Sequence, residues 1–170
     1  MKPDRQPKEF EEKIVLVNRV SKKTKGGNKI GFSVLTVIGD KKGRVGVGLG
    51  KAPAVVNAIR KGVTYAKKHL ITVPMYKKTI PHEVTIKLGA ARIIMKPAPP
   101  GTGVIAGGPV RAVVEAAGIH DIVAKILGTN NKISNVYATF EALQRLRPVN
   151  KYRKMIKTTK EEKKEEPAKE

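Results

Sequence analysis

The chain has 170 residues, with 35 Lys and Arg against 14 Asp and Glu, a formal net charge of +21. So large a positive charge opposes compaction unless a polyanion offsets it, which makes nucleic acid the first candidate partner and an anionic membrane the second. No segment approaches the roughly 18 apolar residues of a membrane span, and the first four residues lack the apolar stretch of a secretory signal. The chain has no cysteine, which excludes disulfides and thiolate metal sites and fits a reducing compartment.

The charge is distributed unevenly along the chain. Residues 1–80 hold 19 basic and 5 acidic groups, a net charge of +14, whereas residues 81–150 hold 8 and 4, a net charge of +4. We therefore expect the polyanion contact in the first half. With three Phe, four Tyr and no Trp, the chain has few side chains for stacking on bases, so contacts with the nucleic-acid backbone are favoured over base stacking.

The first half predicts a β-β-β-α module, assigned to residues 11–73. Three runs of β-branched or alternating apolar residues predict antiparallel strands joined in sequence, at residues 13–20, 30–38 and 45–49. The middle run places one face of alternating side chains together: Ile30, Phe32, Val34, Thr36 and Ile38. Pro53 suits the first turn of a helix, which is expected to end before Pro74.

The second half predicts a β-β-α-β-α module over residues 80–148, after a linker at 72–81. The expected elements, in chain order, are strands at 84–88 and 92–96, a helix at 110–117 capped by Gly118, a strand at 122–127, and a helix begun by Asn130 or Asn131 and stopped near Pro148. Together the two modules indicate an α+β protein of two small domains.

The two ends of the chain are predicted to lie outside the two folded modules. Residues 1–10 predict a disordered arm. Residues 149–170 predict a solvated tail, because they are rich in Lys and Glu and low in apolar residues.

The segment from Arg19 to Lys29, which contains a basic, glycine-containing loop at residues 21–28, is the strongest local signal for function. Five cations within eleven positions, together with hydroxyls and glycines at a hairpin tip, can reach phosphates while the backbone approaches closely. The alternative is an ordinary solvated hairpin tip. The candidate RNA-binding residues in and beside this loop are Arg19, Ser21, Lys22, Lys23, Thr24, Lys25, Gly26, Gly27 and Lys29. Four more basic candidates lie further along the first module: Arg44, Lys51, Arg60 and Lys61.

The segment Gly46-Val47-Gly48-Leu49-Gly50-Lys51 invites a nucleotide-binding interpretation, which the templates do not support. A P-loop needs glycine where Val45 stands, and Ser or Thr where Ala52 stands. The glycines alternate with apolar residues, so they form one face of a strand, which a helix or an RNA backbone could approach closely.

The uncharged Pro/Gly loop at residues 97–109 has two open interpretations, a rigid connector or a surface held against a neighbouring macromolecule. Nothing in the chain resembles an acid–base pair or a nucleophile with its base. His69, His82 and His120 share no metal-ligand spacing. We therefore expect no catalytic residues, no metal and no cofactor.

Three separate motifs then resemble a known family. They are Val17-Asn18-Arg19-Val20-Ser21-Lys22 with Lys25-Gly26-Gly27, then Gly43-Arg44-Val45-Gly46-Val47-Gly48-Leu49-Gly50-Lys51-Ala52, then Gly101-Thr102-Gly103-Val104-Ile105-Ala106-Gly107-Gly108. In this order and spacing they resemble bacterial small-subunit ribosomal protein number five, from about Phe10 to Pro148.

The resemblance implies a first domain like a double-stranded RNA-binding fold and a second with a left-handed crossover. It implies a cytoplasmic structural protein of the ribosome that binds small-subunit ribosomal RNA, contacts small-subunit proteins four and eight and the region where messenger RNA enters, and supports decoding accuracy. The loop around residues 21–27 corresponds to the family's spectinomycin-linked loop. The predicted protein-interface residues are Gly101, Gly103, Gly107 and Arg111.

Two rival functions remain at this point. One is a free-standing regulator that binds double-stranded RNA, which would not need residues 81–147. The other is a nucleotide-binding enzyme that would use residues 46–51. The mismatches between this segment and the P-loop pattern argue against that function.

Overall fold

The computed structural model describes residues 10–148. The expected charged tail at 149–170, and all of the expected arm except Phe10, lie outside the described residues. Phe10 itself is half-buried, and the guanidinium carbon of Arg44 lies 5.1 Å from the centre of its ring.

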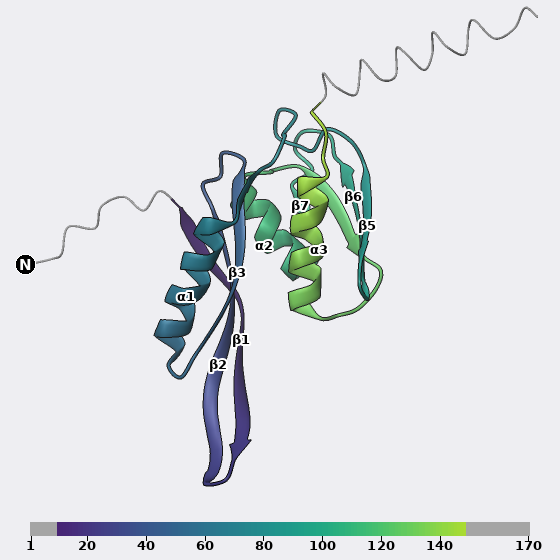
Figure 1. The fold of residues 1–170 in the computed structure, drawn as a ribbon. Helices are drawn as coiled ribbons and strands as arrows, with labels where there is room; N and C mark the ends of the chain where they lie inside the picture. Colours follow the sequence, from purple (N-terminus) through teal and green to yellow (C-terminus); the bar gives the residue numbers. More distant parts are fainter. Residues whose placement is uncertain (1–9, 149–170) are drawn as a thin grey trace, which may run out of the picture.

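The first domain is an antiparallel four-stranded sheet covered on one face by a helix (Figure 1). Its elements are β1 (Glu11–Thr24), β2 (Gly27–Gly39), β3 (Arg44–Ala52), α1 (Val55–Lys68) and β4 (Leu70–Thr72), with the sheet order β1-β2-β3-β4. The expected β-β-β-α succession is confirmed, and β4 is an addition. Pro53 precedes the N-cap, Ala54, instead of lying in the first turn.

The prediction of a loop over residues 21–28 is wrong, because the structure has a much shorter turn there. β1 continues to Thr24 and β2 begins at Gly27, so only Lys25 and Gly26 form the turn. From Leu16 onward the ladder of cross-strand pairs runs without a break to the pair Thr24–Gly27, and the Thr24 hydroxyl donates to the carbonyl of Gly27 over 2.8 Å. The result is a long ribbon that projects beyond the rest of the molecule (Figure 1).

The glycine face of β3 is packed against α1. A Cβ atom on Gly46, Gly48 or Gly50 would overlap the backbone of the helix at Ala66, Gly62 or Ala58, respectively. The helix presents small residues at a spacing of four, which lie on one face. Of the two partners that the glycine face could admit, a helix or an RNA backbone, the structure contains the helix.

The second domain is a mixed sheet with two helices on one face. Its elements are β5 (Val84–Leu88), β6 (Ala91–Pro97), β7 (Val104–Ile105), α2 (Gly108–Ala117), β8 (Ile122–Ile126) and α3 (Lys132–Gln144), with the sheet order β5-β6-β8-β7. The caps are as expected: Gly118 is left-handed at φ 88°, and the Asn131 side chain accepts from the N–H of Ile133. The expected β-β-α-β-α order omitted β7, which pairs with β8 in parallel across α2.

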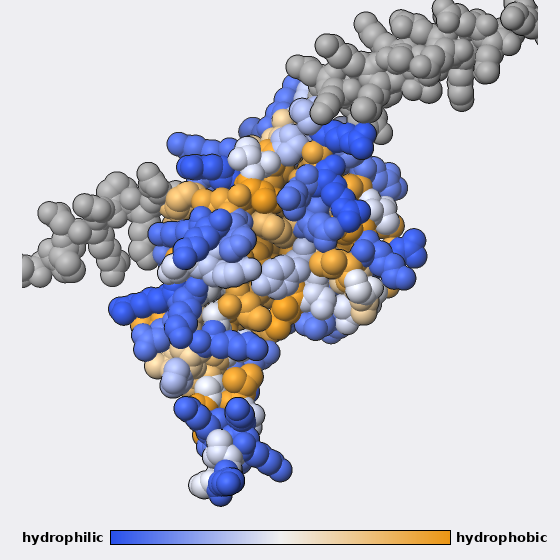
Figure 2. Space-filling model, in the orientation of Figure 1, coloured by the Kyte–Doolittle hydropathy of each residue, from blue (hydrophilic) through white to orange (hydrophobic). Residues whose placement is uncertain are grey.

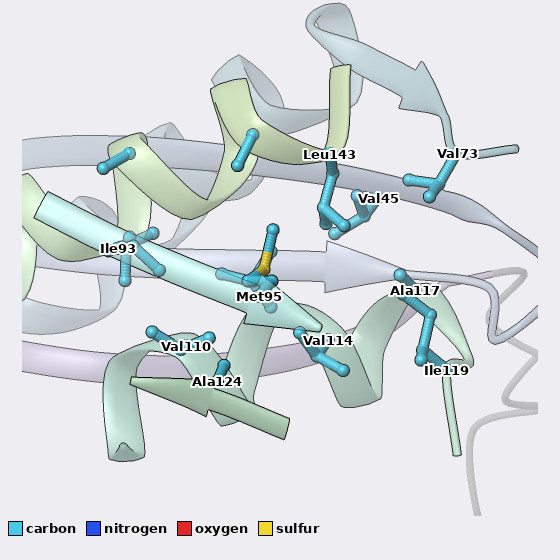
Figure 3. Packing of buried hydrophobic residues seen from close by; sticks show 14 of the residues in the cluster. Val45, Val73, Ile93, Met95, Val110, Val114, Ala117, Ile119, Ala124 and Leu143 are labelled. Atoms are coloured by element: carbon cyan, nitrogen blue, oxygen red, sulfur yellow. The ribbon is translucent and has the colours of Figure 1, made fainter. Parts of the chain in front are cut away.

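The two domains share one hydrophobic core. Helices α2 and α3 lie between the two sheets, and α1 covers the opposite face of the first sheet (Figure 1). Leu35, Val37, Val45 and Val47 of the first sheet belong to the same buried cluster as the second domain's core, and Figure 3 shows Val45 close to Leu143 of α3. The expected linker at 72–81 also contributes to this core, because Val73 and Ile80 are buried within it.

The turn between β2 and β3 joins the domains through the backbone. The N–H groups of Lys41 and Gly43 donate to the carbonyls of Ala116 (3.2 Å) and Ala117 (2.9 Å) at the end of α2. These carbonyls lack partners within their own helix, as the last carbonyls of any helix do. The first domain therefore caps a helix of the second.

Candidate nucleic-acid interface

The β1–β2 hairpin carries a cluster of exposed cations. Its cross-strand register places Lys22 opposite Lys29 and Lys23 opposite Asn28. All nine predicted residues of this segment, Arg19, Ser21, Lys22, Lys23, Thr24, Lys25, Gly26, Gly27 and Lys29, are exposed. Within residues 10–148, no ion pair joins any of these five cations to a carboxylate. Figure 2 shows hydrophilic residues grouped at the hairpin tip.

The cations occupy both faces of the ribbon. Arg19 and Lys23 alternate with Lys22 along β1, so they project to the opposite face from Lys22. Lys51 of β3 pairs with Ser33, which lies four residues from Lys29 on β2, so Lys51 shares a face with Lys22 and Lys29. Like charges directly opposite each other destabilise a sheet. A bound anion would relieve the repulsion between Lys22 and Lys29.

A small groove forms where β3 ends and the hairpin continues. β2 pairs with β3 only as far as the pair Phe32–Ala52, so the hairpin beyond this point has no third strand. The groove has a volume of about 310 Å³. Its lining residues are Val20, Ser21, Lys22, Lys29, Ile30, Gly31, Phe32, Lys51, Ala52 and Pro53. The sequence predicted the three lysines of this groove as RNA-binding residues, but it did not predict that apolar residues would line the groove with them.

Arg44 lies at the other end of β3 from this groove. Its Nε atom is 2.7 Å from Oδ2 of Asp40, and its guanidinium lies over the ring of Phe10. Burial alone would raise the pKa of Asp40, but hydrogen bonds from Arg44 and from the backbone N–H of Lys42 outweigh it, so the pKa of this carboxyl is below its ordinary value. Arg44 therefore stabilises the β2–β3 turn and is not brought together with the hairpin cations.

Arg60 and Lys61 are exposed on α1, as expected for residues outside its apolar stripe. Arg60 lines a separate groove of about 480 Å³ with Glu12, Val56 and Thr64. Neither residue lines the hairpin groove.

The loop at 97–109 is held in place by one buried carboxylate. Oδ1 of Asp121, whose residue is 5% exposed, accepts from the N–H groups of Gly101 and Gly103, each over 3.0 Å. Both glycines have positive φ, 92° and 75°. Asp121 was missed by the sequence reasoning, since a lone aspartate one residue before a strand carries no recognisable signal.

The other two predicted interface residues also have partners within the chain. A Cβ on Gly107 would come within 2.9 Å of Cδ1 of Ile126, so Gly107 allows the chain to pass close to β8. Arg111 donates to the carbonyl of Val104 over 2.8 Å. Arg111 and Val104 line a cleft of about 570 Å³ between the domains, whose charged lining includes Lys13, Lys41 and Glu115.

Residues 10–148 contain no group of three or more His, Asp or Glu side chains placed to hold a metal ion. In the same part of the chain, no helix combines the length and the apolar character needed to cross a membrane.

The comparisons with known proteins agree over both domains. The profile described as ribosomal protein S5, N-terminal domain, matches residues 10–74, and that described as ribosomal protein S5, C-terminal domain, matches residues 86–156. Small ribosomal subunit protein uS5 of Chloroflexus aurantiacus is 54% identical over 138 residues, which cover 81% of this chain and 78% of the relative. The protein of the same name from Thermus thermophilus is 49% identical over 139 residues, covering 82% and 86%. That of Thermotoga neapolitana is 50% identical over 157 residues, covering 92% and 88%. The chain belongs to the bacterial ribosomal protein S5 family.

Proposed function

We propose that this chain is a structural component of the small subunit of the bacterial ribosome and that its β1–β2 hairpin binds ribosomal RNA. The observation that carries the proposal is the charge of the outer part of this hairpin: residues 19–29 contain five Lys or Arg and no Asp or Glu. Cations that are exposed and form no ion pair with a carboxylate of residues 10–148 suit the phosphates of RNA. The family is one of ribosomal structural proteins, not enzymes.

Both rival functions are disfavoured by the fold. A nucleotide site at residues 46–51 would need the glycine face that α1 already covers. A free-standing RNA-binding module would not need a second domain, whereas here the second domain supplies much of the shared core.

Changing Lys22, Lys23 and Lys25 together to alanine is expected to weaken binding to small-subunit ribosomal RNA by roughly tenfold or more at about 0.1 M salt. The fold should persist, because exposed substitutions usually change stability by within about 0.5 kcal/mol. Binding is measured by fluorescence anisotropy and folding by thermal melting.

The matched control removes the same charge from the second domain. Lys87, Arg92 and Lys125 are exposed on the outer face of the second sheet, and changing them to alanine should leave RNA affinity within about twofold of wild type. Equal losses in both variants would mean that net charge, and not the hairpin, determines RNA binding.

The proposal extends to protein neighbours. The loop at 97–109 is uncharged, so it can lie against another protein without desolvating ions. Together with the family resemblance, this favours small-subunit protein four as the partner of Gly101, Gly103, Gly107 and Arg111. Contacts with protein eight and with the region where messenger RNA enters, and a role in decoding accuracy, belong to the same proposal and rest on the resemblance alone.

Replacing Gly103 by arginine is expected to weaken binding to protein four by about tenfold, because the bulky side chain would push the partner away. Affinity for ribosomal RNA should change little, and decoding fidelity in cells should alter. Since φ is 75° at Gly103, any side chain strains the loop, so the control is Gly103→Ala, which carries the strain without the bulk. If Gly103→Ala weakens protein binding as much as Gly103→Arg, the loop acts through its own conformation and the interface proposal is wrong.

A further inference from the structure

We propose that the groove at the root of the hairpin, lined by Val20, Gly31 and Phe32 among others, holds one unstacked nucleobase of the bound RNA. Lys22, Lys29 and Lys51 would contact the phosphates on either side of that base. The inference rests on the proposed RNA-binding function and narrows it from general phosphate contact to recognition of a bulged or looped-out nucleotide.

The groove has an apolar floor that the fold leaves uncovered. Val20, which shares a face of the ribbon with Gly31, Lys22 and Lys29, is 42% exposed, although it lies beside the buried part of the sheet. Phe32 also lines the groove, at its edge, but it follows Gly31 along β2 and projects toward the opposite face, so Val20 is the apolar side chain on the face of the lysines. The face of a nucleobase is apolar and can stack on or pack against such a surface.

Gly31 keeps the groove open. It lies directly opposite Val20, and a Cβ atom at this position would be 3.4 Å from the carbonyl oxygen of Ala52 and 3.7 Å from Cγ2 of Val20. These are ordinary contact distances, so a side chain would fit there, and a larger one would fill the groove. The volume of about 310 Å³ is at the lower end of the range for small-ligand sites, about 300–1,000 Å³, which suits one base better than a longer ligand.

The polar part of the lining fits an anion. It consists of three lysines and the hydroxyl of Ser21, with no carboxylate among the lining residues. Lys22 and Lys29 are a cross-strand pair, so their ammonium groups project side by side. An apolar floor beneath a cationic rim is complementary to a base flanked by its phosphates. It is not complementary to an acidic protein segment, which would bring no flat apolar group to the floor.

A regular duplex cannot use this groove, because its bases are stacked and only its backbone and groove edges are accessible. The chain is poor in aromatic residues, and a single groove accounts for a single base, not a row of stacked ones. RNA with one extruded nucleotide is therefore the expected preferred ligand.

The test uses the full-length chain and two RNA duplexes that differ only by one bulged 2-aminopurine. Wild type should bind the bulged duplex about fivefold or more tighter than the regular one, with a change in 2-aminopurine fluorescence on binding. Gly31→Val should abolish both the preference and the fluorescence change while keeping the affinity for the regular duplex. Asn28→Val places the same side chain on the same strand outside the groove and should behave as wild type.

Each outcome separates the two proposals. Equal affinity of wild type for both duplexes, or a preference that survives Gly31→Val, would overturn the base site while leaving the RNA-binding hairpin in place. Binding of neither duplex would contradict the proposed function itself. If the melting temperature of Gly31→Val is far below that of wild type, Val20→Phe replaces it in the test. Val20 lies at an exposed position, so phenylalanine there fills the groove, and the same outcomes decide the proposal.

Discussion

Replacing Gly50 by alanine is expected to lower the free energy of unfolding by about 3 kcal/mol, because the added methyl group has no space. A Cβ on Gly50 would overlap the carbonyl of Ala58 and lie 2.6 Å from the amide nitrogen of Gly62. Both are backbone atoms of α1, so they move only if the helix moves. Urea unfolding followed by circular dichroism measures the loss.

Gly26→Ala is the matched control for this prediction. Gly26 lies in the hairpin turn with nothing within 4 Å of an added Cβ and without a positive φ. Alanine there should leave stability unchanged or raise it by about 0.5 kcal/mol, because it restricts the unfolded chain. Should Gly50→Ala prove as well tolerated as Gly26→Ala, the close packing of α1 on the glycine face would be refuted.

Replacing Leu35 by alanine is expected to lower the free energy of unfolding by about 3 kcal/mol and to lower the melting temperature of both domains together. Leu35 is 1% exposed and lies on the face of the first sheet that packs against the second domain. Calorimetry should show a single cooperative transition for wild type and variant, since two domains that share a core unfold as one unit.

Ile30→Ala on the same strand provides the comparison. Ile30 is 42% exposed and lies outside the shared hydrophobic cluster. Its truncation should therefore lower the free energy of unfolding by well under half as much as Leu35→Ala does. Two separate calorimetric transitions, with only the first displaced by Leu35→Ala, would show that the domains are independent.

Alternation and capping residues predicted most of the elements, and the two missed strands are the shortest. β4 has three residues and β7 has two, too few for any periodicity. The hairpin tip was also missed as strand, since Lys, Gly and Asn have low strand propensity. There the ladder of backbone hydrogen bonds extends the ribbon, which residue preference does not indicate.

The shared core could be predicted only in part. The run from Val34 to Ile38 is almost continuously apolar, a sign of burial on both faces. Nothing in the sequence identifies α2 and α3 as the elements that cover the second face, because this pairing depends on tertiary packing between domains.

The hairpin cations were predictable because charge and turn residues are local signals. The separate role of Arg44 was not, since its contacts with Asp40 and Phe10 depend on the turn geometry. The groove was also beyond prediction, because it depends on where β3 ends relative to the hairpin.

The salt dependence of RNA affinity tests the central claim most directly, and it is measured on the full chain because the first domain shares its core with the second. If about six phosphates are neutralised, a plot of log affinity against log salt should have a slope of roughly −4 to −6. Changing Lys22, Lys23 and Lys25 to alanine should make the slope shallower by about 2 to 3. A wild-type slope near zero, or a slope that the hairpin variant leaves unchanged, would contradict the account.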